Sequence, residues 1–355
     1  MGFSSTWLWA AAVVAVGIPA GTLPSQAAGK TYTIYLSNNF VGNDWRQQME
    51  RVAQVAAGKA PLQGRVDLHI ENAEGTVQGQ INSLNNIIRQ KPGAILIDAA
   101  SGDALNPTIQ RACDAGIVVV SFDQTVTAPC AYKMHTDFDV MANNQAEWMA
   151  AELGGKGKLL MDDGLAGAPI SQQFMKDFAA TFAKYPGIQI VGHFNGNYAL
   201  GPEQQGVAAL LAANPEVDGI LTQAYGTGAI KALQNAGRPL VPIVAAAFNG
   251  TGVVCAQEHV KCWLGANPPS LSAEAIKLAV DVLYGQQPAN ATADKTVLFN
   301  SPGLTTDPIA VNYAPNSTAV KIELGKNVFP DLPPGLSLPI SPDWVTITPK
   351  EAAGG

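Results

Sequence analysis

The chain has 355 residues and a formal net charge of −7, with 14% charged and 47% hydrophobic residues. This length is enough for about two domains, each with a core of its own. The low charge and the absence of a basic stripe argue against a nucleic-acid partner.

An apolar segment lies at the start of the chain. Residues 7–20 read W-L-W-A-A-A-V-V-A-V-G-I-P-A, and Ser25, Gln26 and Ala27 follow shortly after. This pattern predicts a secretory signal peptide over residues 1–27, although no Lys or Arg precedes the apolar run. Later segments are too short or too polar to cross a bilayer. We therefore expect a periplasmic protein that is cleaved near Ala27.

The first turn after the signal peptide carries informative side chains. Residues 31–37 alternate as a strand does, and residues 45–56 place apolar side chains on one helical face. Amides, an aromatic ring and a guanidinium stand where the two meet, on Asn39, Asn43, Trp45 and Arg46. Such groups can hold a small polar molecule. The alternative is an ordinary loop with Trp45 in the core.

Short apolar strands alternate with helical patterns along the rest of the chain. In the first half we expect strands at residues 66–71, 94–98 and 117–122, with helices at 81–91 and 104–115. A second set has strands at 158–161, 188–194, 219–223, 241–246 and 263–266, and helices at 140–153, 170–185, 203–213, 228–235 and 252–258. One more helix is expected at 272–284, before a Pro-rich extended tail. This alternation predicts an α/β fold with parallel sheets and helices on both faces.

Polar residues recur directly after the expected strands of both sets. They are Ser37, Asp98, Asp123, Gln223, Asn249 and Asn267. Each alone is explained as a capping residue. Because the carboxyl ends of parallel strands meet at one sheet edge, the six together favour a ligand cleft between two lobes.

The four cysteines fit an oxidising compartment. Three pairings of the four cysteines are possible, and the most local one joins Cys113 to Cys130 and Cys255 to Cys262. Free buried thiols are the alternative. Because we expect an exported chain, we predict these two disulfides.

Residue patterns typical of enzymes are missing from the sequence. It contains no G-x-S-x-G, no P-loop and no H-E-x-x-H, and its four histidines are far apart. Asp162 and Asp163 follow a strand, but adjacent side chains point apart, so we expect them to be solvated. We therefore expect a binding protein with no metal and no cofactor.

Several ordered motifs resemble one family. S-N-N-F-V-G-N-D-W-R, A-I-L-I-D-A-A-S-G-D-A-L, G-I-V-V-V-S-F-D-Q and A-A-A-F-N-G-T are similar to segments of the ribose-binding-like type I solute-binding proteins of bacterial ABC importers. The resemblance covers about residues 31–348. It implies two Rossmann-like lobes with parallel sheets, joined by a three-crossing hinge around a ligand cleft. It also implies a monomer that delivers a small-molecule ligand to an ABC transporter permease.

The resemblance also assigns roles to residues. Asn43 would hydrogen-bond a sugar hydroxyl, Trp45 would stack on the ring, and Asp98 would accept hydroxyl protons. The full set of expected ligand-binding residues is Asn39, Asn43, Trp45, Arg46, Asp98, Asp123, Gln124, Phe174, Tyr198, Gln223, Tyr225, Asn249 and Asn267.

The chain departs from the family pattern at positions that hold charged or amide groups in relatives. Phe174 and Gln124 replace arginines of the relatives, and Ala224 replaces an asparagine. These changes favour a neutral sugar or polyol, while Arg46 leaves a small acid open.

The resemblance implies discontinuous lobes. We expect residues 29–136 with 268–294 in the first lobe, 137–267 with 295–325 in the second, and a tail over 326–355. Two alternatives to transport are a ligand-presenting sensor for a chemoreceptor or sensor kinase and, less favoured, a secreted hydrolase.

Overall fold

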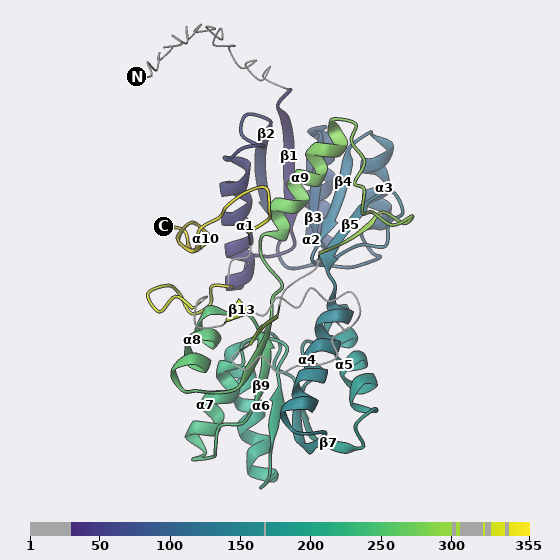
Figure 1. The fold of residues 1–355 in the computed structure, drawn as a ribbon. Helices are drawn as coiled ribbons and strands as arrows, with labels where there is room; N and C mark the ends of the chain where they lie inside the picture. Colours follow the sequence, from purple (N-terminus) through teal and green to yellow (C-terminus); the bar gives the residue numbers. More distant parts are fainter. Residues whose placement is uncertain (1–29, 167, 300–302, 306–321, 324–327, 338–340) are drawn as a thin grey trace, which may run out of the picture.

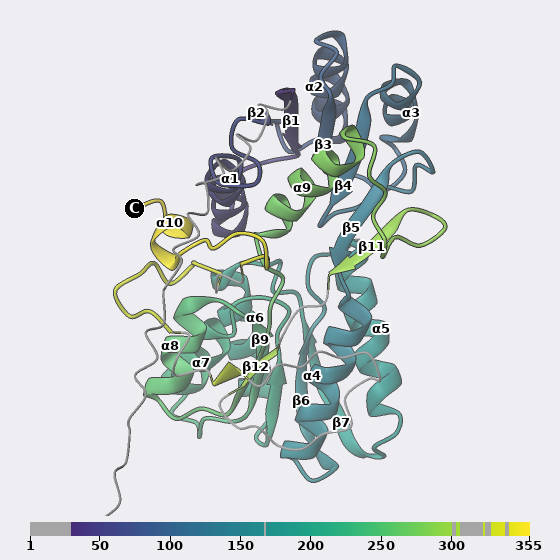
Figure 2. The ribbon, with the colours of Figure 1, turned by 45° about the horizontal axis from the view of Figure 1, so that its top comes forward.

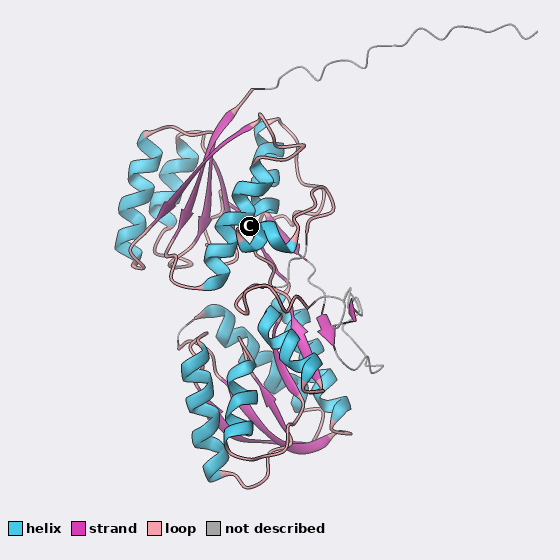
Figure 3. Cartoon of the chain, turned by 90° about the vertical axis from the view of Figure 1, so that its left-hand side faces the viewer, coloured by secondary structure: helices cyan, strands magenta, loops and turns pink. Residues whose placement is uncertain are grey.

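The computed structural model describes residues 30–166, 168–299, 303–305, 322–323, 328–337 and 341–355. The expected signal peptide, residues 1–27, lies outside the described residues. Two lobes, each with helices on both sides of a sheet, lie one above the other (Figures 1 and 3). Of the helices described, none combines the length and the apolarity that crossing a bilayer requires.

The first lobe contains a six-stranded parallel sheet in the order β11-β5-β4-β3-β1-β2. Its strands are β1 (Tyr32–Asn38), β2 (Val66–Asn72), β3 (Ala94–Asp98), β4 (Val118–Phe122), β5 (Tyr132–Thr136) and β11 (Thr296–Phe299). Every residue of β3 is buried, as expected for a central strand that is covered on both faces.

Alternate residues of this sheet face different helices. Leu96 lies in a core with α1 (Asp44–Ala57) and α9 (Leu271–Leu283). Ile95 and Ile97 lie in a core with α2 (Val77–Arg89) and α3 (Asn106–Asp114). The helix expected at 272–284 therefore packs on the first sheet, although it follows the second set in sequence.

The second lobe is built in the same way. Its sheet has the order β13-β12-β10-β9-β8-β6-β7, parallel except where β12 meets β10. The strands are β6 (Lys156–Asp162), β7 (Gly187–Phe194), β8 (Gly219–Leu221), β9 (Ile243–Ala246), β10 (Cys262–Gly265), β12 (Gly303–Thr305) and β13 (Ile322–Glu323). The helices are α4 (Phe138–Glu152), α5 (Pro169–Phe182), α6 (Leu200–Ala213), α7 (Thr227–Asn235) and α8 (Asn249–Gln257). The predicted α/β fold with two parallel-sheet lobes is confirmed.

The chain passes between the lobes three times. It does so from β5 to α4, from β10 to α9, and from β11 to β12. The strands β5 and β11 were not predicted from the sequence, and residues 295–325 were expected in the second lobe. In the structure Thr296–Phe299 pairs with β5 in the first sheet. A four-residue edge strand has too short a pattern to reveal its partner.

Both predicted disulfides are confirmed. Cys113 bonds to Cys130 and Cys255 bonds to Cys262, with Cα–Cα distances of 6.3 and 6.2 Å. The described residues include no free cysteine.

The C-terminal part of the chain returns to the first lobe. In Figure 2 the yellow segment runs from beside α8 to α10, which lies next to α1. The helix α10 (Pro349–Ala353) begins with a capping box between Thr348 and Glu351. The sequence predicted a wholly extended tail here, and this short helix differs from that prediction.

Candidate ligand-binding site

A cavity of about 380 Å³ lies between the two lobes. A volume in this range suits a small molecule. Of the residues expected from the sequence to bind ligand, most line it: Asn39, Asn43, Trp45, Arg46, Asp123, Gln124, Phe174, Tyr198, Gln223, Tyr225 and Asn267. Asp98 and Asn249 are not part of the lining.

Several residues of the cavity wall were not expected from the sequence. Phe40, Phe138, Gln145, Phe248 and Ser337 are the larger or polar ones. Phe40 stands inside the first informative turn, so its position offered a signal. Phe138 follows β5, which was not predicted from the sequence. Ser337 belongs to the tail, and no local pattern connects it with the cavity.

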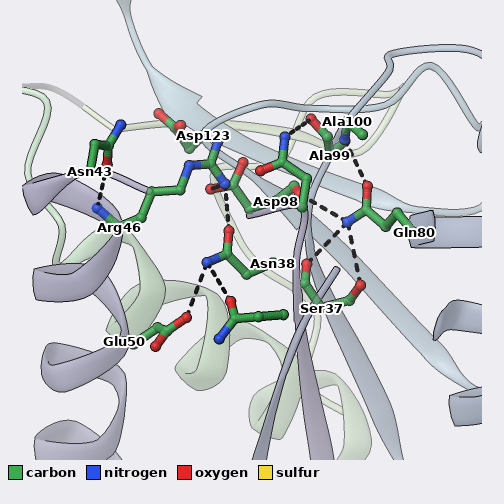
Figure 4. A network of polar contacts seen from close by, with 12 residues as sticks. Ser37, Asn38, Asn43, Arg46, Glu50, Gln80, Asp98, Ala99, Ala100 and Asp123 are labelled. Carbon is green, nitrogen blue, oxygen red and sulfur yellow. Dashed lines mark hydrogen bonds and ion pairs between the residues drawn. The ribbon is translucent and has the colours of Figure 1, made fainter. Parts of the chain in front are cut away.

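Strand register and a helix cap together place Arg46 in the first lobe. Asn38 at the end of β1 lies opposite Asp98 at the end of β3. The Asn43 side chain accepts a hydrogen bond from the Arg46 backbone N–H (2.9 Å) and caps α1. The Arg46 guanidinium then donates to Asn38 Oδ1 (2.5 Å) and forms an ion pair with Asp98 (Figure 4).

Asp98 supports the site from behind and does not face the cavity. Its side chain is fully buried and does not line the cavity, whereas from the sequence we expected it to accept hydroxyl protons from the ligand. Burial raises the pKa of its carboxyl to about 8, while the adjacent Arg46 acts in the opposite direction.

Gln80 of α2 ties the ends of β1 and β3 together. Its Nε2 donates to the Asp98 carbonyl (3.0 Å), and its Oε1 accepts from the Ala100 N–H (2.7 Å), as Figure 4 shows. Gln80 is fully buried. It holds the loop that carries Ala99 and Ala100 against the cavity. A buried glutamine within an amphipathic helix gave no sequence signal for this role.

Asn267 connects the first lobe to a crossing segment. Its Nδ2 donates to Asp123 Oδ1 (2.8 Å), and its Oδ1 accepts from the Thr136 hydroxyl (2.7 Å). Its carbonyl accepts from Trp45 Nε1 (2.7 Å). Burial raises the pKa of Asp123. Because Asn267 lies between β10 and α9, these bonds fix the crossing relative to the cavity wall.

Asp162 organises the second-lobe wall. From the sequence we expected Asp162 to be solvated. It is fully buried, and this burial raises the pKa of its carboxyl. Its carboxyl accepts from the backbone N–H groups of Gly164 (2.8 Å), Gly196 (2.7 Å) and Gln223 (3.2 Å). These bonds hold together the loops that present Tyr198 and Gln223 to the cavity.

Two aromatic pairs form apolar parts of the wall. The rings of Phe138 and Phe174 have centroids 5.9 Å apart, and Tyr225 stacks on Phe248 at 4.5 Å. Aromatic faces of this kind pack well against the C–H faces of sugars and polyols. Tyr198 hydrogen-bonds Ser171, and burial raises its pKa to about 12, so its hydroxyl stays protonated.

Asn249 serves the tail and not the cavity. Its Nδ2 donates to the Phe329 carbonyl (2.9 Å), and its Oδ1 accepts from the Phe329 N–H (2.8 Å). Asn249 was expected to contact ligand, but in this structure its amide is bonded to the tail and it does not line the cavity. The position of Asn249 after a strand did not reveal that Phe329 of the tail would occupy its amide.

A family model described as a periplasmic binding protein domain matches residues 34–287. The chain belongs to this family. The xylitol-binding protein of Mycolicibacterium smegmatis is 25% identical over 244 residues, which are 66% of this chain and 67% of that protein.

Solved structures show the same fold. An ABC transporter solute-binding protein from Thermobispora bispora is 28% identical, with a TM-score of 0.66 over 76% of this chain and 84% of that one. A periplasmic solute-binding protein from Actinobacillus succinogenes, solved with D-allose, is 22% identical, with a TM-score of 0.67 over 76% of this chain and 96% of that one. All three of these relatives are described as binding proteins.

In this periplasmic binding protein, the cavity wall carries buried acceptors that lack partners. Asn39 Oδ1, Gln145 Oε1 and Gln223 Oε1 have no hydrogen-bond partner among the described residues. All three residues line the cavity. Each of these oxygens is itself buried, so a ligand donor would reach it only after the amide turns toward the cavity, and the new bond would then satisfy an acceptor that lacks a partner.

Proposed function

We propose that the protein captures a neutral polyol or sugar between its lobes and delivers it to the permease of an ABC importer. The observation that carries this proposal is the set of three unpaired amide oxygens beside aromatic walls. Hydroxyl groups can donate to the amides, while C–H faces pack on Phe174 and Tyr225. The xylitol-binding relative supports a polyol of this size.

The charge distribution supports a neutral ligand. The Arg46 guanidinium is already paired with Asp98 and Asn38, and the Asp123 carboxyl lies in the same cavity wall. A ligand carboxylate would therefore have to displace Asp98 or Asn38 to reach the guanidinium, and it would lie beside the Asp123 carboxyl. This argues against the small acid that the sequence alone left open.

The remaining parts of the role follow from the family. Proteins of this group close on ligand by a hinge and present the closed form to a membrane permease. The expected signal peptide over residues 1–27 would export the chain, and we propose that it works as a monomer. Of the thirteen residues that the sequence predicted to bind ligand, we propose that the eleven lining the cavity do so.

Xylitol and xylonate test the proposal because they share a hydroxylated chain but differ in charge. We expect xylitol to stabilise the protein by about 2.7 kcal/mol at 100 times its Kd, which raises Tm by about 5–10 °C. Xylonate should give a much smaller rise. Thermal melts with pentitols, hexitols and aldoses at equal concentration would show which neutral compound raises the Tm most. If acids stabilise the protein and none of the neutral compounds does, the proposed ligand class is wrong.

A further inference from the structure

The tail segment Val328–Ser337, here called the clasp, contacts both lobes. It lies beyond the family match, which ends at residue 287. Its first residues pack beside the second-lobe core, and Leu336 packs in a cluster with Val52 of α1. Figures 1 and 2 show the yellow tail on the side of the molecule where α8 and α1 approach each other.

On the second-lobe side, the start of α8 holds the clasp. Asn249 exchanges hydrogen bonds with Phe329 in both directions, and its backbone N–H donates to the Leu336 carbonyl (2.7 Å). The Gly250 N–H donates to the Pro334 carbonyl (2.8 Å). A Cβ at Gly250 would lie 2.7 Å from Pro334 Cβ, so the two backbones are in direct contact.

On the first-lobe side, Gln48 of α1 holds the clasp. Its Nε2 donates to the Ser337 carbonyl (2.9 Å), and its Oε1 accepts from the Ser337 N–H (2.7 Å). Both residues are buried. Next to them, a Cβ at Gly335 would lie 1.8 Å from Asp44 Oδ2. The clasp is thus as close to the first lobe as it is to the second.

We propose that the clasp fastens the two lobes together beside the ligand cavity, and that it contributes Ser337 to the cavity wall and raises ligand affinity. Ser337 lines the cavity and pairs with Phe248, another lining residue, in a β-bridge. To separate the lobes, the chain must break either the Gln48 pair or the Asn249 bonds. A larger population of the binding-competent arrangement lowers the apparent Kd by the same factor. This inference rests on the proposed function for its effect on affinity, but not for the fastening itself.

The test releases the clasp from each lobe in turn. Gln48→Ala removes both side-chain hydrogen bonds to the first lobe. Asn249→Ala removes the side-chain hydrogen bonds to the second lobe and leaves the backbone bonds of residues 249 and 250. Gln47→Ala and Gln257→Ala are matched controls because they are exposed side chains on the same two helices. In the unliganded full chain, small-angle X-ray scattering should give a larger radius of gyration for both release variants and an unchanged one for the controls. With xylitol as the probe, calorimetry should give a Kd about tenfold higher for either variant, and no further increase for the double variant.

Two outcomes would overturn the proposal that the clasp fastens the lobes together. One is an unchanged radius of gyration in every release variant that melts cooperatively, and the other is an equal increase in the controls. Because scattering needs no ligand, it decides the fastening even if neither xylitol nor any other neutral compound binds the wild type. The absence of any binding by xylitol and the other neutral compounds would overturn the proposed function and leave the clasp untouched. If one release variant does not fold, the variant on the other lobe still decides.

Discussion

Trp45 takes part in both packing and ligand binding. Its ring lines the cavity and also packs against the first-lobe core, while its Nε1 donates to the Asn267 carbonyl at 2.7 Å. The sequence left two alternatives for this residue, a pocket position and a core position. The half-buried ring contacts both regions, so truncation should affect both stability and binding.

We predict that Trp45→Ala lowers the free energy of unfolding by about 3 kcal/mol and weakens xylitol binding by about 1–3 kcal/mol. Trp45→Phe should lose less of both because an apolar ring remains. Melting curves and titrations with xylitol measure the two effects. Trp344→Phe is the control, since it also removes an indole donor, here to Glu274, away from the cavity. Unchanged xylitol affinity in Trp45→Ala would exclude the stacking role.

At the scale of elements, each disulfide joins a helix to the segment that follows it. Cys113 lies in α3 and Cys130 just before β5, with a sequence separation of 17. Cys255 lies in α8 and Cys262 begins β10, with a separation of 7. A cross-link restricts the unfolded chain more when it closes a longer loop.

We therefore predict unequal losses on removing the two bonds. Replacing Cys113 and Cys130 by serine should cost about 3 kcal/mol, and replacing Cys255 and Cys262 about 2 kcal/mol. Urea unfolding of the two double variants, each with its remaining disulfide intact, gives both values. Equal stability of the wild type before and after reduction would contradict this account.

At the scale of the whole molecule, several buried carboxyls have raised pKa values. Burial is the first cause in each case, and it raises the pKa of Asp98 to about 8 and that of Glu203 to about 7. Asp123, Asp162 and Glu274 are shifted in the same direction. In the unfolded chain such groups ionise near pH 4. Between pH 4 and pH 8 the folded protein therefore binds more protons than the unfolded chain.

It follows that stability should fall as the pH rises through this window. We predict a lower Tm at pH 8 than at pH 5, with a smaller decrease in Asp98→Asn, which removes one of the raised groups. Asp114→Asn, on an exposed aspartate, is the matched control and should follow the wild type. Thermal melts at one-unit steps in buffers of equal ionic strength measure this. A Tm that rises from pH 5 to pH 8 would contradict the prediction.

The sequence by itself determined the two-lobe α/β fold, the cysteine pairs and eleven of the residues that line the cavity. Apolar periodicity is local, so it identified strands and helices without knowledge of their partners. Asn39, Asp123, Gln223 and Asn267 could be placed in one site because parallel strands end at a common edge.

Only the tertiary structure decided which polar groups face the cavity. Asp98 and Asp162 follow strands in the same way as Asp123, but they are fully buried behind the wall. Gln48 and Ser337 are 289 residues apart and form a buried pair that joins tail and first lobe. The free energy of a buried polar group depends on its partners, and distant segments supply those partners. Local sequence patterns do not reveal such contacts between distant segments. For this reason the sequence suggested a ligand-binding role for Asn249, which in the structure is bonded to the tail.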